Sequence, residues 1–146
     1  MGPGIVPSVS TMPLVSVTRL RLRKRRFILG FAYFALVSLV QAKRSRGNLH
    51  ATAIRQDGLV FWTITVWEDE AAMREFRTAG SHRRAMSRLA EWRDEAIYVR
   101  WNPVAGEIPT LQEAFVQLKA HGIVSKVTHP STAHEARDFS PPAEPV

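Results

Sequence analysis

Apolar and polar residues alternate along residues 59–67, and this period of two predicts a central β-strand. β-branched and aromatic residues occupy both of its faces, so one face is expected to be dry and the other partly polar. Asp57-Gly58 precedes the run, and this dipeptide between two apolar segments predicts a hairpin turn. The dry face would carry Val60, Trp62, Ile64 and Val66, and the partly polar face Phe61, Thr63, Thr65 and Trp67.

The period changes to that of a helix after this strand. The acidic residues 68–70 suit a helix start, because the helix dipole favours negative charge there, and apolar residues then recur at helical spacing. Gly80-Ser81 interrupts the pattern, since Gly can end one helix and Ser can cap the next. A second helical segment runs from His82 to Trp92, and residues 96–101 alternate as a further strand.

The remaining elements lie before and after this unit. Residues 14–22 are predicted to form the first strand, with a β-bulge or an early end near Thr18-Arg19, where the apolar positions shift from odd to even numbers. Residues 48–55 are predicted to form the second strand. A short helix is expected from Pro109-Thr110 to Gly122.

The apolar segment 27–42 is predicted to be the first helix of the domain, because basic residues and then a glycine follow it. Its sixteen residues would extend about 24 Å, short of a bilayer core of about 30 Å, so packing on the sheet is expected rather than a membrane span. The helix is apolar on all sides, and its outer stripe needs cover from a partner subunit, a lipid surface or a long tail. The inner stripe is Ile28, Phe31, Ala35 and Ala42, and the outer stripe is Leu29, Tyr33, Leu36 and Val40.

The order β-α-β-β-α-β with a short extra helix is typical of the α+β ferredoxin-like arrangement. Right-handed crossovers place both main helices on one face of a four-stranded antiparallel sheet and leave the other face open. Residues 14–122 would form this domain. Residues 1–13 are predicted to be a flexible leader, and residues 123–146 a mostly disordered tail.

Charge and composition argue against several classes of function and site. The formal net charge is +7, and six basic residues fall within residues 19–26. This cluster lacks interleaved aromatic residues and no recognition helix follows it, so nucleic-acid binding is disfavoured. The absence of cysteine excludes disulfides and thiolate metal sites. Residues 1–13 lack the order of a secretory signal, so a cytoplasmic protein that contacts membranes at most peripherally is expected.

The run FWTITVWEDEAAMREFRTAGSHRRAMSRLAEW, residues 61–92, resembles the spheroidene-monooxygenase-like group of the antibiotic-biosynthesis-monooxygenase superfamily. The pattern of that group is a Thr-rich strand ending in Trp, an acidic helix start, a Met/Phe helix face, a His and a second apolar turn. The resemblance extends over residues 14–118. It implies a homodimer in which two sheets pack face to face as a dimeric α/β barrel, with an apolar substrate inside. Spheroidene monooxygenases act on carotenoids and are associated with heme, so heme is a candidate cofactor.

His82 is the candidate catalytic residue, because a neutral imidazole can take a proton or ligate iron. Heme-degrading relatives carry a functional His ligand on this helix, so the resemblance also makes His82 a candidate heme ligand. Those relatives use an Asn, Trp and His triad, and the position that matches their Trp is Phe76 here. The triad is therefore incomplete, which argues against transferring their reaction. The alternative for His82 is a structural hydrogen bond near a helix start.

A substrate pocket is expected between the strand at residues 59–67 and the helical segment that ends at residue 92. Threonines there either line the pocket or pair across strands, and aromatic residues either line it or fill the core. The expected pocket residues are Trp62, Thr63, Thr65, Trp67, Phe76 and Trp92. The sequence has no phosphate-binding glycine loop and no metal-ligand spacing, so no metal site is predicted.

Two functions stay open on these grounds. One is a monooxygenase-like enzyme that acts on or binds an apolar small molecule, with heme or without a cofactor. The other is a non-catalytic dimeric ligand-binding or structural protein, because proteins of one fold often share no chemistry. A heme absorption spectrum distinguishes the heme-dependent enzyme from the rest.

Overall fold

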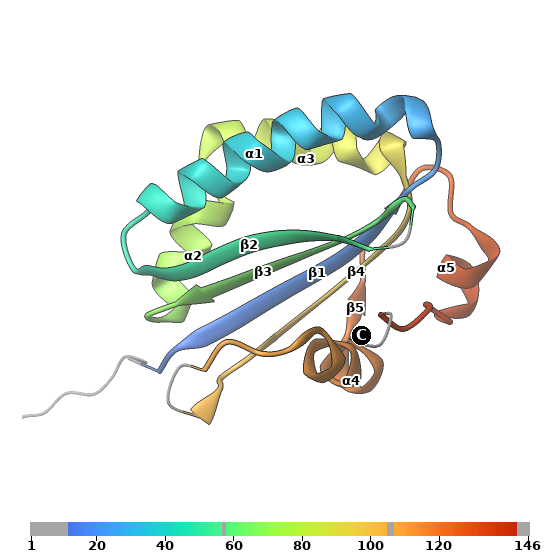
Figure 1. Ribbon diagram of the computed structural model, residues 1–146. Coiled ribbons are helices and arrows are strands. Elements are labelled where there is room, and N and C mark those ends of the chain that lie inside the picture. The colour runs from blue at the N-terminus through green and yellow to red at the C-terminus, as the bar shows by residue number, and fades with distance from the viewer. Residues whose placement is uncertain (1–11, 57, 105–106, 143–146) are drawn as a thin grey trace, which may run out of the picture.

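Five strands form one antiparallel sheet in the order β2-β3-β1-β4-β5 (Figure 1). The computed structural model describes residues 12–56, 58–104 and 107–142, so most of the leader and residues 143–146 lie outside it. The strands are β1 (Leu14–Leu22), β2 (Asn48–Gln56), β3 (Val60–Trp67), β4 (Arg93–Trp101) and β5 (Ile123–Val124). The helices are η1 (Arg25–Phe27), α1 (Ile28–Arg44), α2 (Glu70–Arg77), α3 (Gly80–Trp92), α4 (Leu111–His121) and α5 (Thr132–Ala136). This order confirms the ferredoxin-like α+β fold, with β5 added at one edge.

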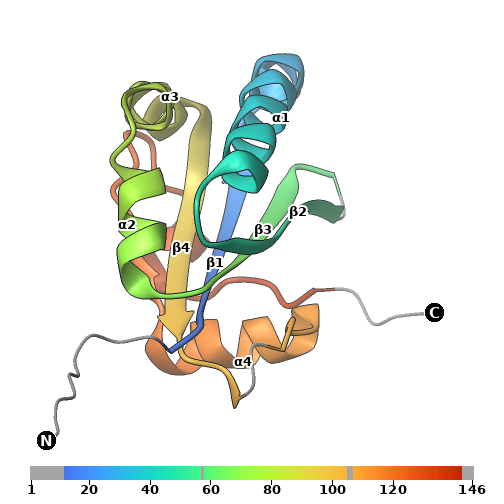
Figure 2. The same ribbon diagram turned by 90° about the vertical axis from the view of Figure 1, so that its left-hand side faces the viewer.

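The sheet lies between two helical layers. Helices α1, α2 and α3 cover one face, and α4 lies against the other (Figures 1 and 2). Alternate strand residues therefore face different layers, since successive side chains in a strand point to opposite faces. On β1, Val15 and Val17 belong to the core under α4, whereas Leu20 and Leu22 pack with Phe31 of α1.

This double cover corrects the predicted bulge in β1. The strand pairs without interruption through Thr18 and Arg19, and its register shifts only between Arg21 and Leu22 opposite β4. The apolar positions change from odd to even numbers because each face of the strand has its own core. A change of strand direction is not needed to bury both sets.

A local capping signal marks the start of α2 but not that of α3. Asp69 caps α2, because its carboxylate accepts a hydrogen bond of 2.8 Å from the backbone N–H of Ala72. The chain then breaks at Thr78 and Ala79, and α3 begins at Gly80 with Ala79 as its N-cap. The predicted roles of Gly80 as a helix end and Ser81 as a cap are therefore wrong by one or two positions.

The face of the sheet opposite α1–α3 is apolar, and this chain covers it itself. Trp62 and Val17 are completely buried there, and Ala114 and Leu118 of α4 pack against them. Phe139 of the C-terminal segment adds to the same core. The resemblance implies that a second copy covers this face, whereas α4 and the C-terminal segment of the same chain cover it here. A face-to-face barrel would require α4 to move away.

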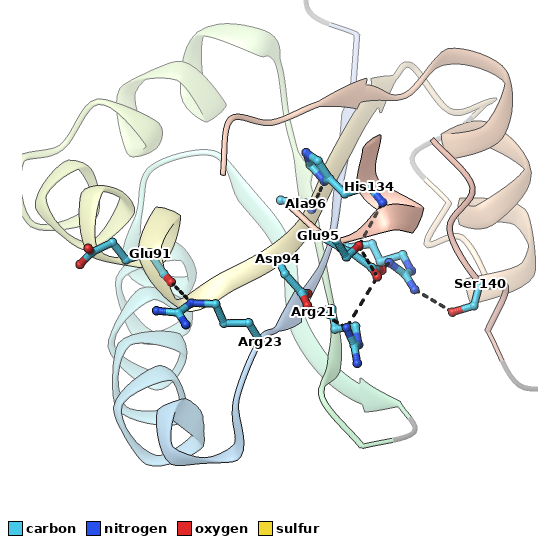
Figure 3. Close-up of polar contacts among 10 residues, drawn as sticks. Arg21, Arg23, Glu91, Asp94, Glu95, Ala96, His134 and Ser140 are labelled. Atoms are coloured by element: carbon cyan, nitrogen blue, oxygen red, sulfur yellow. Dashed lines mark hydrogen bonds and ion pairs between the residues drawn. The ribbon is translucent and has the colours of Figure 1, made fainter. Parts of the chain in front are cut away.

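The C-terminal segment is ordered by a buried polar cluster that begins at β4 (Figure 3). β4 starts three residues earlier than predicted and carries Glu95 into the core, where its carboxylate pairs with the Arg19 guanidinium at 2.9 Å. Ser131 donates a 3.0 Å hydrogen bond to the second oxygen of Glu95, and Arg19 donates one of 2.8 Å to Ser140. These bonds attach Ser131 and Ser140 to the sheet, within the segment for which the sequence predicts a mostly disordered tail.

His134 completes this attachment. Its Nδ1 accepts a hydrogen bond of 3.2 Å from the backbone N–H of Ala96. The backbone N–H of His134 donates a hydrogen bond to the hydroxyl of Ser131, which caps α5. Burial lowers the pKa of the His134 imidazole, against the opposing influence of Glu95. A neutral ring is what the bond to Ala96 requires, because a protonated Nδ1 cannot accept.

Candidate functional site

A cavity of about 260 Å³ lies between the sheet and the layer formed by α1, α2 and α3. Its floor consists of residues from four adjacent strands, with Ala53 as the contribution of β2. On β1, β3 and β4 these floor residues are mostly small or polar, whereas the helices contribute bulky apolar side chains. The floor includes Ser16, Thr18, Thr63, Thr65 and Tyr98, and the helical walls include Phe31, Phe34, Leu39, Met73, Phe76 and Met86.

The cavity follows from this difference in side-chain size. Threonine and serine side chains on the central strands do not reach the helices, so space remains above the strands. The hydroxyl of Thr65 on β3 donates a hydrogen bond of 3.5 Å to the carbonyl of Ser16 on β1. This hydroxyl is therefore engaged in cross-strand pairing. The expected pocket therefore exists, but it also extends under α1.

His82 lines the cavity from the first turn of α3. Its ring lies 4.7 Å from the ring of Phe76, and the two planes are inclined by 47°. The Nδ1 atom is buried and has no hydrogen-bond partner in the described part of the chain. Burial lowers the pKa of the His82 imidazole, and the charge of Arg77 lowers it further. His82 is consequently a neutral base at neutral pH, with one ring nitrogen available.

An aromatic wall supports His82. Phe76 lies between His82 and Trp67, and the ring centroids of Phe76 and Trp67 are 5.2 Å apart. Trp67 is completely buried, and its indole N–H has no partner among the described residues. The wall fixes one side of the imidazole through packing, because tilted aromatic pairs at this separation attract each other.

Three arginines give the cavity a positive potential. Arg77, Arg93 and Arg100 line it, and its lining in the described structure contains no acidic residue. Burial lowers the pKa of the Arg100 guanidinium, and Arg77 lowers it further, while Tyr98 and Glu70 oppose this shift. Arg100 lies over the ring of Tyr98, with its guanidinium carbon 4.7 Å from the ring centroid. A negative group in the cavity would thus be stabilised.

The structure brings five of the predicted site residues around one cavity, namely Thr63, Thr65, Trp67, Phe76 and His82. Trp62 does not line it, because its position on β3 points to the opposite face, where it packs under α4. Trp92 also lies outside the cavity lining. It packs against Phe27 and Phe34 at 5.7 Å each, and above Gly30, where an added Cβ would come within 2.8 Å of its ring.

Sequence reasoning missed the arginines and the contribution of α1. Arg100 has the same strand parity as Tyr98, so the alternation along β4 could have placed it on the floor. Arg93 carried no such signal, since it precedes the predicted start of the strand. The inner stripe of α1 was assigned to the sheet, yet Phe31 and Ala35 also line the cavity.

A heme does not fit the site. The cavity of about 260 Å³ is enclosed between the sheet and the bulky apolar side chains of α1, α2 and α3, which leaves no room for the broad, rigid heme macrocycle. Nδ1 of His82 has the chemistry of an iron ligand, but the phenyl ring of Phe76 lies beside the imidazole. The described residues also hold no cluster of three His, Asp or Glu side chains for a metal ion.

A family described as "Domain of unknown function (DUF3291)" matches residues 36–139, more than half of the chain. The chain belongs to this family. The match includes His82 and the arginines of the cavity, and it extends through β5 and α5, so the C-terminal segment is part of the DUF3291 domain. No curated protein matches the sequence.

Solved structures show the same fold at low sequence identity. A candidate antibiotic biosynthesis monooxygenase from Nitrosomonas europaea is 13% identical, with a TM-score of 0.60 over 68% of this chain and 97% of its own. SnoaB, a cofactor-independent oxygenase from Streptomyces nogalater, is 15% identical, with a TM-score of 0.56 over 68% of this chain and 99% of its own. A conserved protein from Methanosarcina mazei is 11% identical, with a TM-score of 0.59 over 64% and 95%. The DUF3291 domain therefore has the fold of antibiotic-biosynthesis-monooxygenase-like proteins.

Proposed function

We propose that this protein is a monooxygenase-like enzyme that binds an apolar small molecule in the cavity between the sheet and α1–α3. The observation that carries this proposal is the His82 imidazole, which is neutral, has a free ring nitrogen and faces a mostly apolar cavity. In this reaction His82 is the general base. The fold shared with a cofactor-independent oxygenase supports the reaction class by analogy.

The chemistry needs only a base, a positive potential and dioxygen. His82 removes a proton from an acidic methylene of the substrate, and Arg77 and Arg100 stabilise the negative charge that develops. The carbanion then gives electrons to dioxygen. The methylene and one dioxygen yield one ketone and one water, so that one oxygen atom enters the product and the other leaves as water. Aromatic walls exclude bulk water from the reacting centre.

Oxygen consumption with a fused-ring aryl ketone that bears an acidic methylene tests this proposal. We expect turnover without added cofactor, one oxygen atom of labelled dioxygen in the product, and loss of turnover in His82→Ala. Arg83→Gln is the control, since Arg83 is exposed on the same helix. Equal turnover in His82→Ala would remove His82 from the reaction.

A heme-dependent reaction gives a different readout. Purified protein with added hemin should show no shifted Soret band, because the cavity does not hold the macrocycle. The resemblance to the spheroidene-monooxygenase-like group suggests that the apolar substrate is a polyene, which must carry the acidic methylene that this reaction requires. A Soret band that disappears in His82→Ala would replace the cofactor-free reaction with a heme-dependent one.

The second candidate is a non-catalytic ligand-binding protein. It is favoured by the unpartnered Nδ1 of His82, because catalytic imidazoles are usually oriented by a third group. Binding of aromatic ketones without oxygen consumption, unchanged in His82→Ala, would support this reading.

We further propose that α1 rests on an anionic membrane surface. Leu29 is 85% exposed and Leu36 is 62% exposed, although both are apolar. Exposed basic residues lie at both ends of the helix, and α1 has no acidic residue. Anionic lipids complement this arrangement, as for helices that lie in the membrane interface. The substrate would enter the cavity from the lipid phase beside α1.

Spanning is a poor alternative, although Arg25–Arg44 is long and apolar enough to cross a membrane by length and composition. Phe31 and Ala42 bury one side of α1 against the sheet. β1 and β2, which flank the helix, belong to that same sheet, so the helix cannot insert without it.

The homodimer predicted from the resemblance would need a surface other than the covered sheet face, and the outer stripe of α1 is available to it.

Flotation with vesicles distinguishes a membrane surface from a second copy of the chain as the partner of the outer stripe of α1. We expect binding to vesicles of phosphatidylcholine and phosphatidylglycerol, weak binding to phosphatidylcholine alone, and loss of binding in Leu36→Glu. Val116→Glu is the control, because Val116 is 64% exposed on α4, on the other side of the sheet. A dimer in sedimentation that dissociates in Leu36→Glu, without vesicle binding, would assign the stripe to a second copy instead.

A further inference from the structure

Arg93 is a buried cation without a counter-ion. Its side chain lines the cavity, and the residue is only 5% exposed. Its Nη2 donates a 3.3 Å hydrogen bond to the backbone carbonyl of Lys126, whereas the buried Nε has no partner in the described chain. Burial alone accounts for the lowered pKa of this guanidinium. Such a charge is costly unless a negative group compensates it.

Arg19 shows how this fold otherwise treats a buried arginine. Arg19 is 1% exposed, and its guanidinium contacts Glu95 at 2.9 Å. The carboxylate nearest in sequence to Arg93, that of Asp94, is bound instead by Arg21 at 2.8 Å. The acidic residues beside Arg93 are therefore engaged on other arginines, and no ion pair of Arg93 is present among the described residues.

The position of Arg93 distinguishes it from the other cavity arginines. Arg93 and Arg100 lie seven residues apart on β4, which corresponds to about 23 Å at about 3.3 Å per strand residue. Arg77 acts electrostatically on both His82 and Arg100, so these three residues lie at one end of the cavity. Arg93 lies at the other end, where it pairs with Leu22 across the sheet, and Leu22 packs in one cluster with Leu20 and Phe31. The walls between the two ends are largely apolar.

We propose that the natural ligand is an elongated apolar acid whose carboxylate is bound by Arg93, with its reactive part beside His82. The proposal rests on the cavity of the proposed function and adds the substrate class. The carboxylate supplies the missing counter-ion of Arg93, and a guanidinium suits it because two N–H donors can face two oxygens. The apolar chain fills the space between Arg93 and the aromatic wall of Phe76 and Trp67. An uncharged apolar molecule would leave Arg93 uncompensated.

The test uses parinaric acid, an elongated fluorescent polyene acid, and its methyl ester as probes of the full-length protein. We expect the acid to bind at least about tenfold more tightly than the ester, which is the effect of one charge-assisted hydrogen bond. Arg93→Gln should remove this difference by weakening acid binding alone, and Arg93→Lys should restore part of it. Arg83→Gln is the control, since Arg83 is exposed on α3.

The outcomes separate the two proposals. Equal binding of acid and ester to the wild type would overturn the acid proposal without any variant having to fold. Equal acid binding by Arg93→Gln and wild type, with similar circular dichroism, would also overturn it. His82→Ala should leave acid binding unchanged, because it removes the base and not the anchor. Loss of turnover in His82→Ala with no preference for the acid would keep the oxygenase function and discard the substrate class.

Discussion

The ring of His82 packs against the ring of Phe76, with a centroid separation of 4.7 Å and an interplanar angle of 47°. Phe76 is thus the side chain that separates the imidazole from the buried Trp67. The two residues come from different helices, α2 and α3, and the break at Thr78-Ala79 lets them meet. Phe76 therefore packs against one side of the proposed base.

Replacing Phe76 should therefore affect both stability and turnover. Phe76→Ala removes a half-buried ring and should lower the free energy of unfolding by about 2 kcal/mol, below the usual range for a fully buried Phe. His82→Ala should cost less than about 1 kcal/mol while abolishing turnover. Urea unfolding with an activity assay measures both. If His82→Ala unfolds the domain and Phe76→Ala leaves turnover intact, His82 is structural.

The Arg19–Glu95 pair should be the most sensitive electrostatic contact in the fold. Glu95→Gln leaves the Arg19 charge buried without a counter-ion, which should lower the free energy of unfolding by about 3–5 kcal/mol. Glu70→Gln is the matched control, because Glu70 pairs with Arg74 at 2.7 Å on the surface and should cost less than about 1 kcal/mol. Equal costs for the two variants, measured by urea unfolding, would contradict the burial of the Arg19–Glu95 pair.

Stability should fall as the pH falls below about 6.5. The pKa of His134 and that of His82 are both lowered by burial, so the unfolded chain takes up protons first, and stability is lost from about pH 6.5 down through the lowered values. The raised pKa of Asp94 acts in the opposite direction in more acidic solution. Thermal unfolding between about pH 7.5 and 5.5 measures the slope, which should be smaller in His134→Gln. If the slope is the same in His134→Gln as in the wild type, the hydrogen bond from Ala96 to His134 does not contribute to the pH dependence of stability.

Removing residues 123–146 should expose the core under α4. The truncated chain loses Ser131, Ser140 and the ring of Phe139, so the Arg19–Glu95 pair becomes accessible to water. We expect binding of an apolar fluorescent dye and a lower melting temperature. An unchanged melting temperature would instead support the disordered tail predicted from the sequence, because such a tail contributes nothing to the stability of the fold.

The elements whose signals are local were predictable from the sequence. Alternating apolar residues predict a strand at residues 14–22, which matches β1. The helix predicted from Thr110 to Gly122 matches α4, because a threonine cap and a glycine end lie at its two ends. The start of β4 was missed because Arg93, Asp94 and Glu95 are charged. Their burial depends on Arg19, Arg21 and the C-terminal segment, which are remote in sequence.

The candidate site was predictable in the same way, in part. Threonine parity on β3 placed Thr63 and Thr65 in the pocket, and the same alternation places Trp62 on the other face. The role of Arg93 could not be predicted, because a missing counter-ion is a property of the folded neighbourhood. The cover of the open sheet face was equally remote, since it depends on how α4 returns across the sheet.

The most direct test of the account is a titration of the cavity with parinaric acid after the cavity has been filled. Ala35 lines the cavity from α1, so Ala35→Phe should occupy its space and abolish binding, whereas Ala32→Phe, at an exposed position of the same helix, should bind as the wild type does. Fluorescence titration of the three proteins gives the three affinities. We expect loss of binding in Ala35→Phe alone, and equal affinities for Ala35→Phe and the wild type would contradict the claim that this cavity is the ligand site.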